Sequence, residues 1–424
     1  MRLGRMQLDT GAAFAATGIL IATNGPSIWL TNRRTHVGYD IEAWPYLYPF
    51  ALLAVVAIVG LARHRFERDR PQLWAVAAMA IYVAWMLLSA TWSVAPNITT
   101  IRALVAAGVA AFGVWFGVGL SRVQQLRAVS TAMGIAVVAS ALLVRFRPLE
   151  GGGYWDGERH IFFRGIFANA NSLGPVCVVG AVSFVSCALL ARRWSQRCIW
   201  YILMLVSLWL LWRSGSDTAR AALLIVVIGC FAGMAIWLAY RGGVPKSILV
   251  IGSSVLATTG IVLVIANFWQ MSDLVAGDST FGGRRQIWDV VLDAIPHRLW
   301  QGHGYWAYIN GPGPIDPVLL TSGSAHNAAL EVLLDLGIVG LVPFVATVGL
   351  AVYQIVRGAL RKLDVLSLWP VAMLAVVLLE NVTESFVLFY SYIWVLLIAA
   401  SFAPSDAVVD DQTPAAEVAI SSSS

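Results

Sequence analysis

Apolar stretches long enough to cross a bilayer recur along almost the whole chain, and this leaves little choice of fold. A transmembrane helix needs about 20 apolar residues, and in hydrocarbon a single segment can satisfy its backbone hydrogen bonds only as a helix. Charged residues make up 12% of the chain, whereas soluble domains carry about 25%. The sequence therefore predicts an all-α integral membrane protein with about twelve transmembrane helices. The predicted spans are residues 11–30, 46–62, 72–91, 101–120, 126–144, 168–191, 199–212, 218–240, 247–269, 327–356, 365–383 and 386–403.

Basic residues give these predicted helices an orientation. The N-terminal segment and the short loops that follow every second span hold 16 of the 28 lysines and arginines, as is typical of cytoplasmic segments. Both termini are therefore expected in the cytoplasm. The first span contains Asn24, Gly25 and Pro26 and lacks a small-residue cleavage site, so we predict a retained helix rather than a signal peptide. The basic loops are residues 63–70, 121–127, 192–198, 241–246 and 357–364.

One membrane domain, residues 1–404, is predicted to precede a short tail, residues 405–424, whose polar and acidic composition is typical of disorder. The longest loop, residues 270–325, joins the ninth and tenth spans on the non-cytoplasmic side. It is rich in Gly, Trp and Tyr. Its aromatic residues could stack on sugar rings or form a belt at the membrane interface. These aromatic residues are Trp300, Tyr305, Trp306 and Tyr308.

Cysteines and histidines are not arranged for metal binding. The four cysteines fall in predicted helices or at a cytoplasmic edge, no CxxC motif occurs, and the six histidines do not pair at helical spacing. We therefore expect no disulfide framework, no metal and no cofactor. The net charge of +5 comes mostly from cytoplasmic arginines, which suits anionic membrane lipids better than nucleic acid.

Arginines on the non-cytoplasmic side oppose the orientation rule and so indicate another use. An acidic or phosphate-bearing ligand on that face is the simplest one. These arginines are Arg145, Arg147, Arg159, Arg164, Arg213, Arg220, Arg284, Arg285 and Arg298.

Two of these arginine segments begin predicted helices. In RSGSDTARAALL, Ser216 or Asp217 can cap a helix, with Arg220 in its first turn. An arginine that only snorkels and pairs with Asp217 is the alternative. In FGGRRQIWDVVLDAI, Arg284 and Arg285 begin an amphipathic helix expected on the outer surface. The apolar stripe of this helix is Ile287, Trp288, Val291 and Ile295.

Two further segments place polar residues at the start of a span. In FFRGIFANANSLG, Arg164 precedes Asn169 and Asn171, which could bind a ligand or cap the helix. In SAHNAALEVLLDLG, Ser324 is the expected N-cap and His326 lies in the first turn, where the helix dipole disfavours a protonated ring. A neutral imidazole of that kind can act as a general base.

Polar residues continue from this histidine down the same helix face. Asn327, Glu331 and Asp335 follow at i, i+4 spacing, and could orient neighbouring groups or satisfy polar groups inside the bundle. An interfacial histidine with packing carboxylates is the alternative.

Four of these segments together resemble the superfamily of O-antigen ligases and Wzy-type polysaccharide polymerases. RAALL resembles its Arg-x-x-x-Leu motif, HNAALEVLLDLG its His-x(10)-Gly motif, and GRRQIW its Gly-Arg-x-x-Ile-Trp element. RGIFANANSLG resembles its Arg-Gly-x-Phe-x-x-x-Asn-x-Leu-Gly segment, and the resemblance extends from residues 87–104 to the eleventh span.

This resemblance implies a metal-independent glycosyltransferase of the bacterial inner membrane with its active site facing the periplasm. The donor would be an undecaprenyl diphosphate-linked glycan, and the acceptor a hydroxyl of another glycan or of lipid A core. His326 would activate that hydroxyl, and Arg220 with Arg284 or Arg285 would bind the diphosphate. Arg164, Asn171, Asn327 and Glu331 would support them.

The resemblance leaves several alternatives for the function open. The resemblance does not separate O-antigen ligation, polymerisation of O-antigen or exopolysaccharide, and transfer to protein. Nor does it decide which of the adjacent Arg284 and Arg285 contacts phosphate. A transporter is the rival class, but it predicts internal symmetry and charged residues near the bilayer midplane in both halves. Here they gather in the second half, at one surface.

Overall fold

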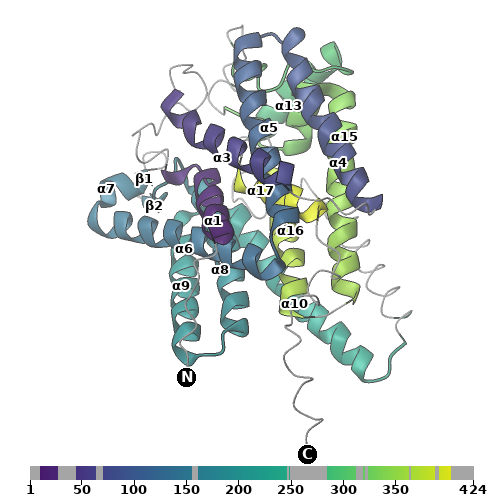
Figure 1. The fold of residues 1–424 in the computed structure, drawn as a ribbon. Helices are drawn as coiled ribbons and strands as arrows, with labels where there is room; N and C mark the ends of the chain where they lie inside the picture. Colours follow the sequence, from purple (N-terminus) through teal and green to yellow (C-terminus); the bar gives the residue numbers. More distant parts are fainter. Residues whose placement is uncertain are drawn as a thin grey trace, which may run out of the picture.

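In the residues that the computed structural model describes, the fold is helical apart from one short antiparallel hairpin, β1–β2 (Figure 1). The described residues are 10–26, 44–63, 70–154, 161–245, 248, 284–311, 319, 323–361, 364–386 and 391–402. The elements are α1 Thr10–Ala22, α3 Trp44–Arg63, α4 Arg70–Leu88, η1 Ser89–Thr91, α5 Pro96–Gly119, α6 Arg122–Phe146, α7 Pro148–Gly151, β1 Gly152–Tyr154, β2 Ile161–Phe163, α8 Ala170–Leu190, α9 Trp194–Ser214, α10 Asp217–Arg241, α13 Arg284–Ala294, η2 Ile295–Arg298, α15 Ala328–Arg361, α16 Val365–Thr383 and α17 Tyr392–Ser401.

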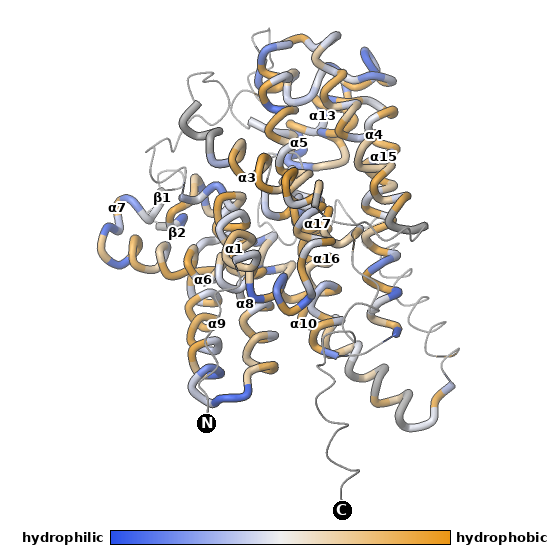
Figure 2. The backbone as a smooth tube through the Cα atoms, viewed as in Figure 1, coloured by the Kyte–Doolittle hydropathy of each residue, from blue (hydrophilic) through white to orange (hydrophobic). Residues whose placement is uncertain are grey.

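Seven helices among the described residues are long and apolar enough to cross a membrane, and three shorter apolar helices accompany them. The predicted helical membrane protein is thereby confirmed, whereas the count of twelve spans is not. The predicted span 247–269 and the tail 405–424 lie outside the described residues, apart from the single residue Ile248. Figure 2 shows apolar residues along the helices and hydrophilic ones at turns, such as that between α8 and α9.

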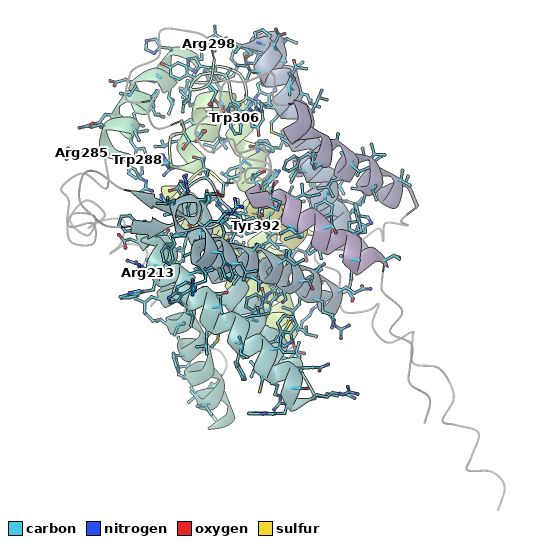
Figure 3. All side chains as sticks on the ribbon, turned by 90° about the vertical axis from the view of Figure 1, so that its left-hand side faces the viewer. Arg213, Arg285, Trp288, Arg298, Trp306 and Tyr392 are labelled. Atoms are coloured by element: carbon cyan, nitrogen blue, oxygen red, sulfur yellow. The ribbon has the colours of Figure 1, made fainter. Side chains whose placement is uncertain are left out.

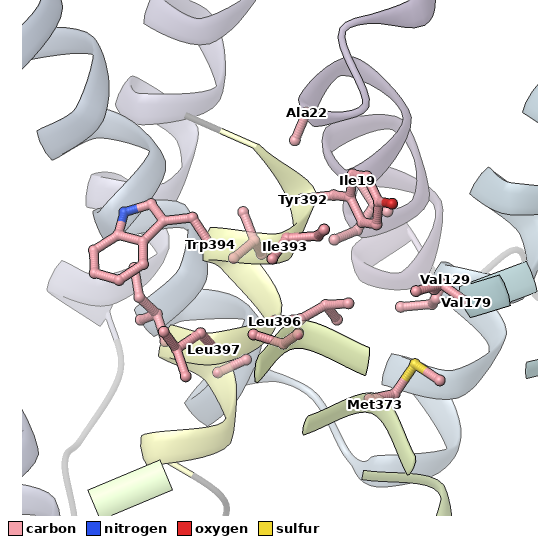
Figure 4. Close-up of a cluster of buried hydrophobic side chains, with 14 of the residues drawn as sticks. Ile19, Ala22, Val129, Val179, Met373, Tyr392, Ile393, Trp394, Leu396 and Leu397 are labelled. Carbon is pink, nitrogen blue, oxygen red and sulfur yellow. The ribbon is translucent and has the colours of Figure 1, made fainter. Parts of the chain in front are cut away.

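The core is centred on α17, because every residue of this helix is buried. A helix that is apolar on all sides lies either in a protein core or against lipid, and α17 lies in the protein core. It packs against α5, α15 and α16, and α1 lies close to it as well. In Figure 4, Tyr392 and Ile393 of α17 lie near Ile19 of α1, with Met373 of α16 and Val179 of α8 nearby.

A backbone break divides α15 at Gly337, where φ is +66°. That value lies in the left-handed region, which glycine adopts without steric cost. A Cβ at this position would overlap the carbonyl group of Trp300. The amides of Ile338 and Val339 bond instead to the carbonyls of Leu299 and Trp300, at 2.9 and 3.2 Å. The chain after η2 therefore completes the hydrogen bonding of the broken helix.

The long predicted loop is folded where it is described. The apolar stripe of α13 is buried against Ile309, Ala325 and Leu334, which confirms the amphipathic helix and shows that protein covers its apolar face. Tyr305 and Trp306 are also buried, so neither the sugar-stacking nor the belt interpretation holds for them. Trp300 differs, because its side chain is 68% exposed.

Candidate functional site

A carboxylate that the sequence analysis missed organises the site. Glu384 follows α16 directly, and its side chain is only 9% exposed. Its Oε1 accepts hydrogen bonds from Nη2 of Arg284 at 2.7 Å and from Nδ2 of Asn171 at 2.9 Å. Its Oε2 lies 2.8 Å from Nδ1 of His326. Three predicted site residues from distant segments thus meet on one carboxylate. Its one sequence signal is a glutamate immediately after a predicted span.

The beginnings of four helices approach this carboxylate. Asn171 and Arg284 lie in the first turns of α8 and α13, and His326 lies two residues before α15. At the start of α10, the hydroxyl of Thr218 accepts a hydrogen bond from Thr383, the neighbour of Glu384, at 3.0 Å. Helix N-termini carry partial positive charge and unpaired amide groups. Together with Arg284, they place positive charge around Glu384 at this end of the bundle.

Asn327, and not Ser324, caps α15. Its Oδ1 accepts from the amide of Leu330 at 3.1 Å, and the helix begins at Ala328. His326 therefore precedes the helix instead of lying in its first turn, so that prediction was wrong. Its φ of +48° is rare for a non-glycine residue. The prediction failed because the chain turns at His326, before the helix begins, and this turn directs the imidazole to Glu384.

The charges around His326 also correct the expectation drawn from the helix dipole. Burial disfavours the charged ring, but the hydrogen-bonded carboxylate of Glu384 outweighs it, and the pKa of His326 is raised above its ordinary value. Burial likewise opposes ionisation of Glu384, but His326 and Arg284 outweigh it and lower the pKa of this carboxyl. The ring is therefore a stronger base than an ordinary histidine.

The polar stripe below His326 holds backbone groups together, as one of the two interpretations predicted. Asn327 binds the end of α16: its side-chain amide donates to the carbonyl of Val382, and its backbone amide donates to the hydroxyl oxygen of Ser385, both at 3.1 Å. Glu331 accepts from the amide of Ala325 at 3.0 Å. These contacts fix the chain on both sides of His326 and place it beside Glu384.

The remaining predicted arginines do not join this cluster through any contact described for them. Arg220 bonds to Asp217 at 2.9 Å and to the carbonyl of Trp212, whose ring it also covers. Arg285 is exposed, and Figure 3 shows it at the edge of the molecule near Trp288. Arg164 donates from Nε to the carbonyl of Glu150 at 3.1 Å, on the chain that leads into the hairpin.

Among the described residues, no three His, Cys, Asp or Glu side chains are grouped as a metal site would require. The chemistry available at this place comes from the imidazole of His326, the buried carboxylate of Glu384, the amide of Asn171 and the guanidinium group of Arg284. Such groups can transfer a proton and stabilise an anion.

Comparison with known proteins agrees with the motifs. Residues 206–345 match the family described as O-antigen ligase. The matched segment contains Arg220, Arg284 and His326, but it excludes Asn171 and Glu384. No curated protein matches the chain. Over residues 206–345, this membrane protein is therefore similar to the O-antigen ligase family that its motifs resemble.

Proposed function

We propose that this protein is a metal-independent glycosyltransferase that moves a glycan from an undecaprenyl diphosphate-linked donor to an acceptor hydroxyl on the periplasmic face of the inner membrane. The observation that carries the proposal is the pairing of His326 with Glu384, beside Arg284 and at the converging helix starts. The O-antigen ligase match over residues 206–345 supports the choice of substrate class.

His326 supplies the base in this reaction. Its Nδ1 is engaged by Glu384, which leaves Nε2 to take the proton of the acceptor hydroxyl. The hydroxyl oxygen then attacks the anomeric carbon, and the bond from that carbon to the phosphate oxygen breaks. The bonding electrons leave with the lipid diphosphate. A carboxylate that orients a histidine in this way also stabilises the imidazolium that forms.

Arginines and helix starts stabilise the leaving diphosphate. Arginine has a permanent charge and a planar fork that matches phosphate oxygens. Nε of Arg284 is buried and has no hydrogen-bond partner among the described residues, so this guanidinium can still bind a ligand. Arg285 is next to it and exposed, and Arg220 lies on the start of α10. These three arginines are the proposed diphosphate-binding residues.

The test is transfer by purified protein in nanodiscs, with a defined lipid diphosphate-linked glycan and candidate acceptors. We expect His326→Ala and Arg220→Ala to lose most transfer, measured as released undecaprenyl diphosphate and as product mass. Matched controls are His297→Ala, an exposed histidine in η2, and Arg147→Ala, an exposed arginine paired with Glu150. Both controls should transfer as well as the wild type.

The product mass separates ligation, in which a glycan joins lipid A core, from polymerisation, in which repeat units lengthen. Full transfer by folded His326→Ala would remove the proposed base. Movement of the intact lipid-linked glycan across the bilayer by wild type, without transfer, would favour the transporter class instead.

A further inference from the structure

The shared carboxylate connects the proposed phosphate-binding residue to the proposed base. We infer that Glu384 is a positioning residue through which an anion bound at Arg284 changes the proton affinity of His326. The inference deepens the proposed function and rests on it for its meaning in catalysis. The coupling itself is a property of the folded protein and is measurable without any glycan.

The two oxygens of the Glu384 carboxylate have different partners. Oε1 is shared by Arg284 and Asn171, whereas Oε2 faces only the ring of His326 among the contacts described. Bonding at Nδ1 orients the ring and leaves Nε2 as the proton acceptor. Burial of the pair keeps water from screening these charges. A change at one oxygen is therefore transmitted to the other.

Charged groups on three elements face the ring of His326. Glu384 at the end of α16 and Glu331 on α15 favour its protonated form, and Arg284 on α13 opposes it. Glu380, one turn earlier on α16, is a further buried carboxyl group near this end of the helix. Only Arg284 in this set carries positive charge, and its side chain, at the start of α13, is 16% exposed.

A bound anion would change the balance of these charges. A diphosphate at Arg284 neutralises the guanidinium and draws it from Glu384. The carboxylate then presents more of its negative charge to His326, whose proton affinity rises. Donor binding would thus strengthen the base before the acceptor hydroxyl is deprotonated. Asn171 keeps the carboxylate in place during this change.

The test is the pH dependence of His326 carbethoxylation by diethyl pyrocarbonate, which modifies only the neutral ring, followed by peptide mass spectrometry. In wild type we expect a midpoint above the ordinary value for a histidine. Modification of the exposed His297 in every sample checks the activity of the reagent. Glu384→Gln should lower the midpoint by about one pH unit or more, because an adjacent opposite charge is removed. Arg284→Gln should shift it upward. Glu150→Gln, which removes an exposed carboxylate on α7, should leave it unchanged.

Ligand coupling is tested with inorganic pyrophosphate as the probe. Pyrophosphate should raise the His326 midpoint in wild type and should have no effect in Arg284→Gln. An unchanged midpoint in folded Glu384→Gln, or a downward shift in Arg284→Gln, overturns the inference. If Glu384→Gln does not fold, the Arg284→Gln and pyrophosphate results decide it alone.

Transfer assays on the same variants separate this inference from the proposed function. Glu384→Asp keeps the charge but shortens the side chain. We therefore expect its His326 midpoint to stay above that of Glu384→Gln, while transfer is reduced. Midpoint shifts as stated, combined with full transfer by His326→Ala, would retain the coupling and reject His326 as the base.

Discussion

Two buried carboxylates on neighbouring helices, Asp335 and Glu384, have different partners. Asp335 on α15 accepts from the backbone amide of Trp306 at 2.7 Å. Glu384 after α16 accepts only from side chains in its described contacts, those of Asn171, Arg284 and His326. A carboxylate bound to backbone holds a chain path, whereas one bound to ionisable side chains adjusts their charge. The comparison separates a carboxylate that holds the backbone from one that joins the side chains of the proposed site.

In the region around Asp335 on α15, the largest effect is expected from Gly337→Ala. The added methyl group would meet the backbone at Trp300, and the left-handed φ would be strained as well. We expect a loss of folded protein, measured as the monodisperse fraction in size-exclusion chromatography. Gly349→Ala on the same helix is the control, because nothing lies within 4 Å of its added Cβ. Equal folding of the two variants would contradict the role given to Gly337.

Removing each of the two carboxylates in turn sharpens the comparison. Asp335→Ala leaves the buried amide of Trp306 without its acceptor, which costs about 1–3 kcal/mol. We expect a lower apparent unfolding temperature with transfer per folded molecule largely kept. Glu384→Gln should do the reverse, losing transfer with a smaller effect on unfolding. Thermal unfolding and transfer are measured on the same preparations, and the same pattern in both variants would refute the distinction.

The pH dependence of transfer should follow His326. Its pKa is raised by Glu384, against the opposing effect of burial, so the proportion of neutral ring falls as the pH falls through that elevated value. Transfer should therefore decline on the acid side at a higher pH than an ordinary histidine would give. In Glu384→Gln the residual transfer should decline at lower pH. An acid limb that does not move would exclude His326 as its origin.

The smallest effect is expected at the start of α10. Asp217 pairs with Arg220 at 2.9 Å, and its side chain is 61% exposed. Exposed pairs contribute about 0–1 kcal/mol, so Asp217→Asn should release Arg220 for phosphate at little cost. We expect up to about a five-fold lower KM for the donor, by the same range of free energy, with kcat unchanged. A raised KM would mean that Asp217 positions Arg220 for the donor.

Local patterns accounted for the helices and for the polar residues at their ends. Apolar length predicted α16 with its observed bounds, Val365–Thr383, and the stripe of α13 was recognised from its spacing. These features depend on residues a few positions apart. His326 and Arg284 could be recognised from the sequence as candidate site residues, because an ionisable group beside an apolar span is energetically costly and indicates a function.

The sequence by itself determined where the helices run and which ionisable side chains stand at their ends. The tertiary structure alone decided that Glu384 joins residues 58, 100 and 213 positions away. It also decided that the chain at Leu299 and Trp300 completes the broken helix at Gly337. Periodicity and capping act over one or two turns, whereas these contacts require separate helices to pack first. The charge of the histidine depends on that packing, and so do the groups it can act upon.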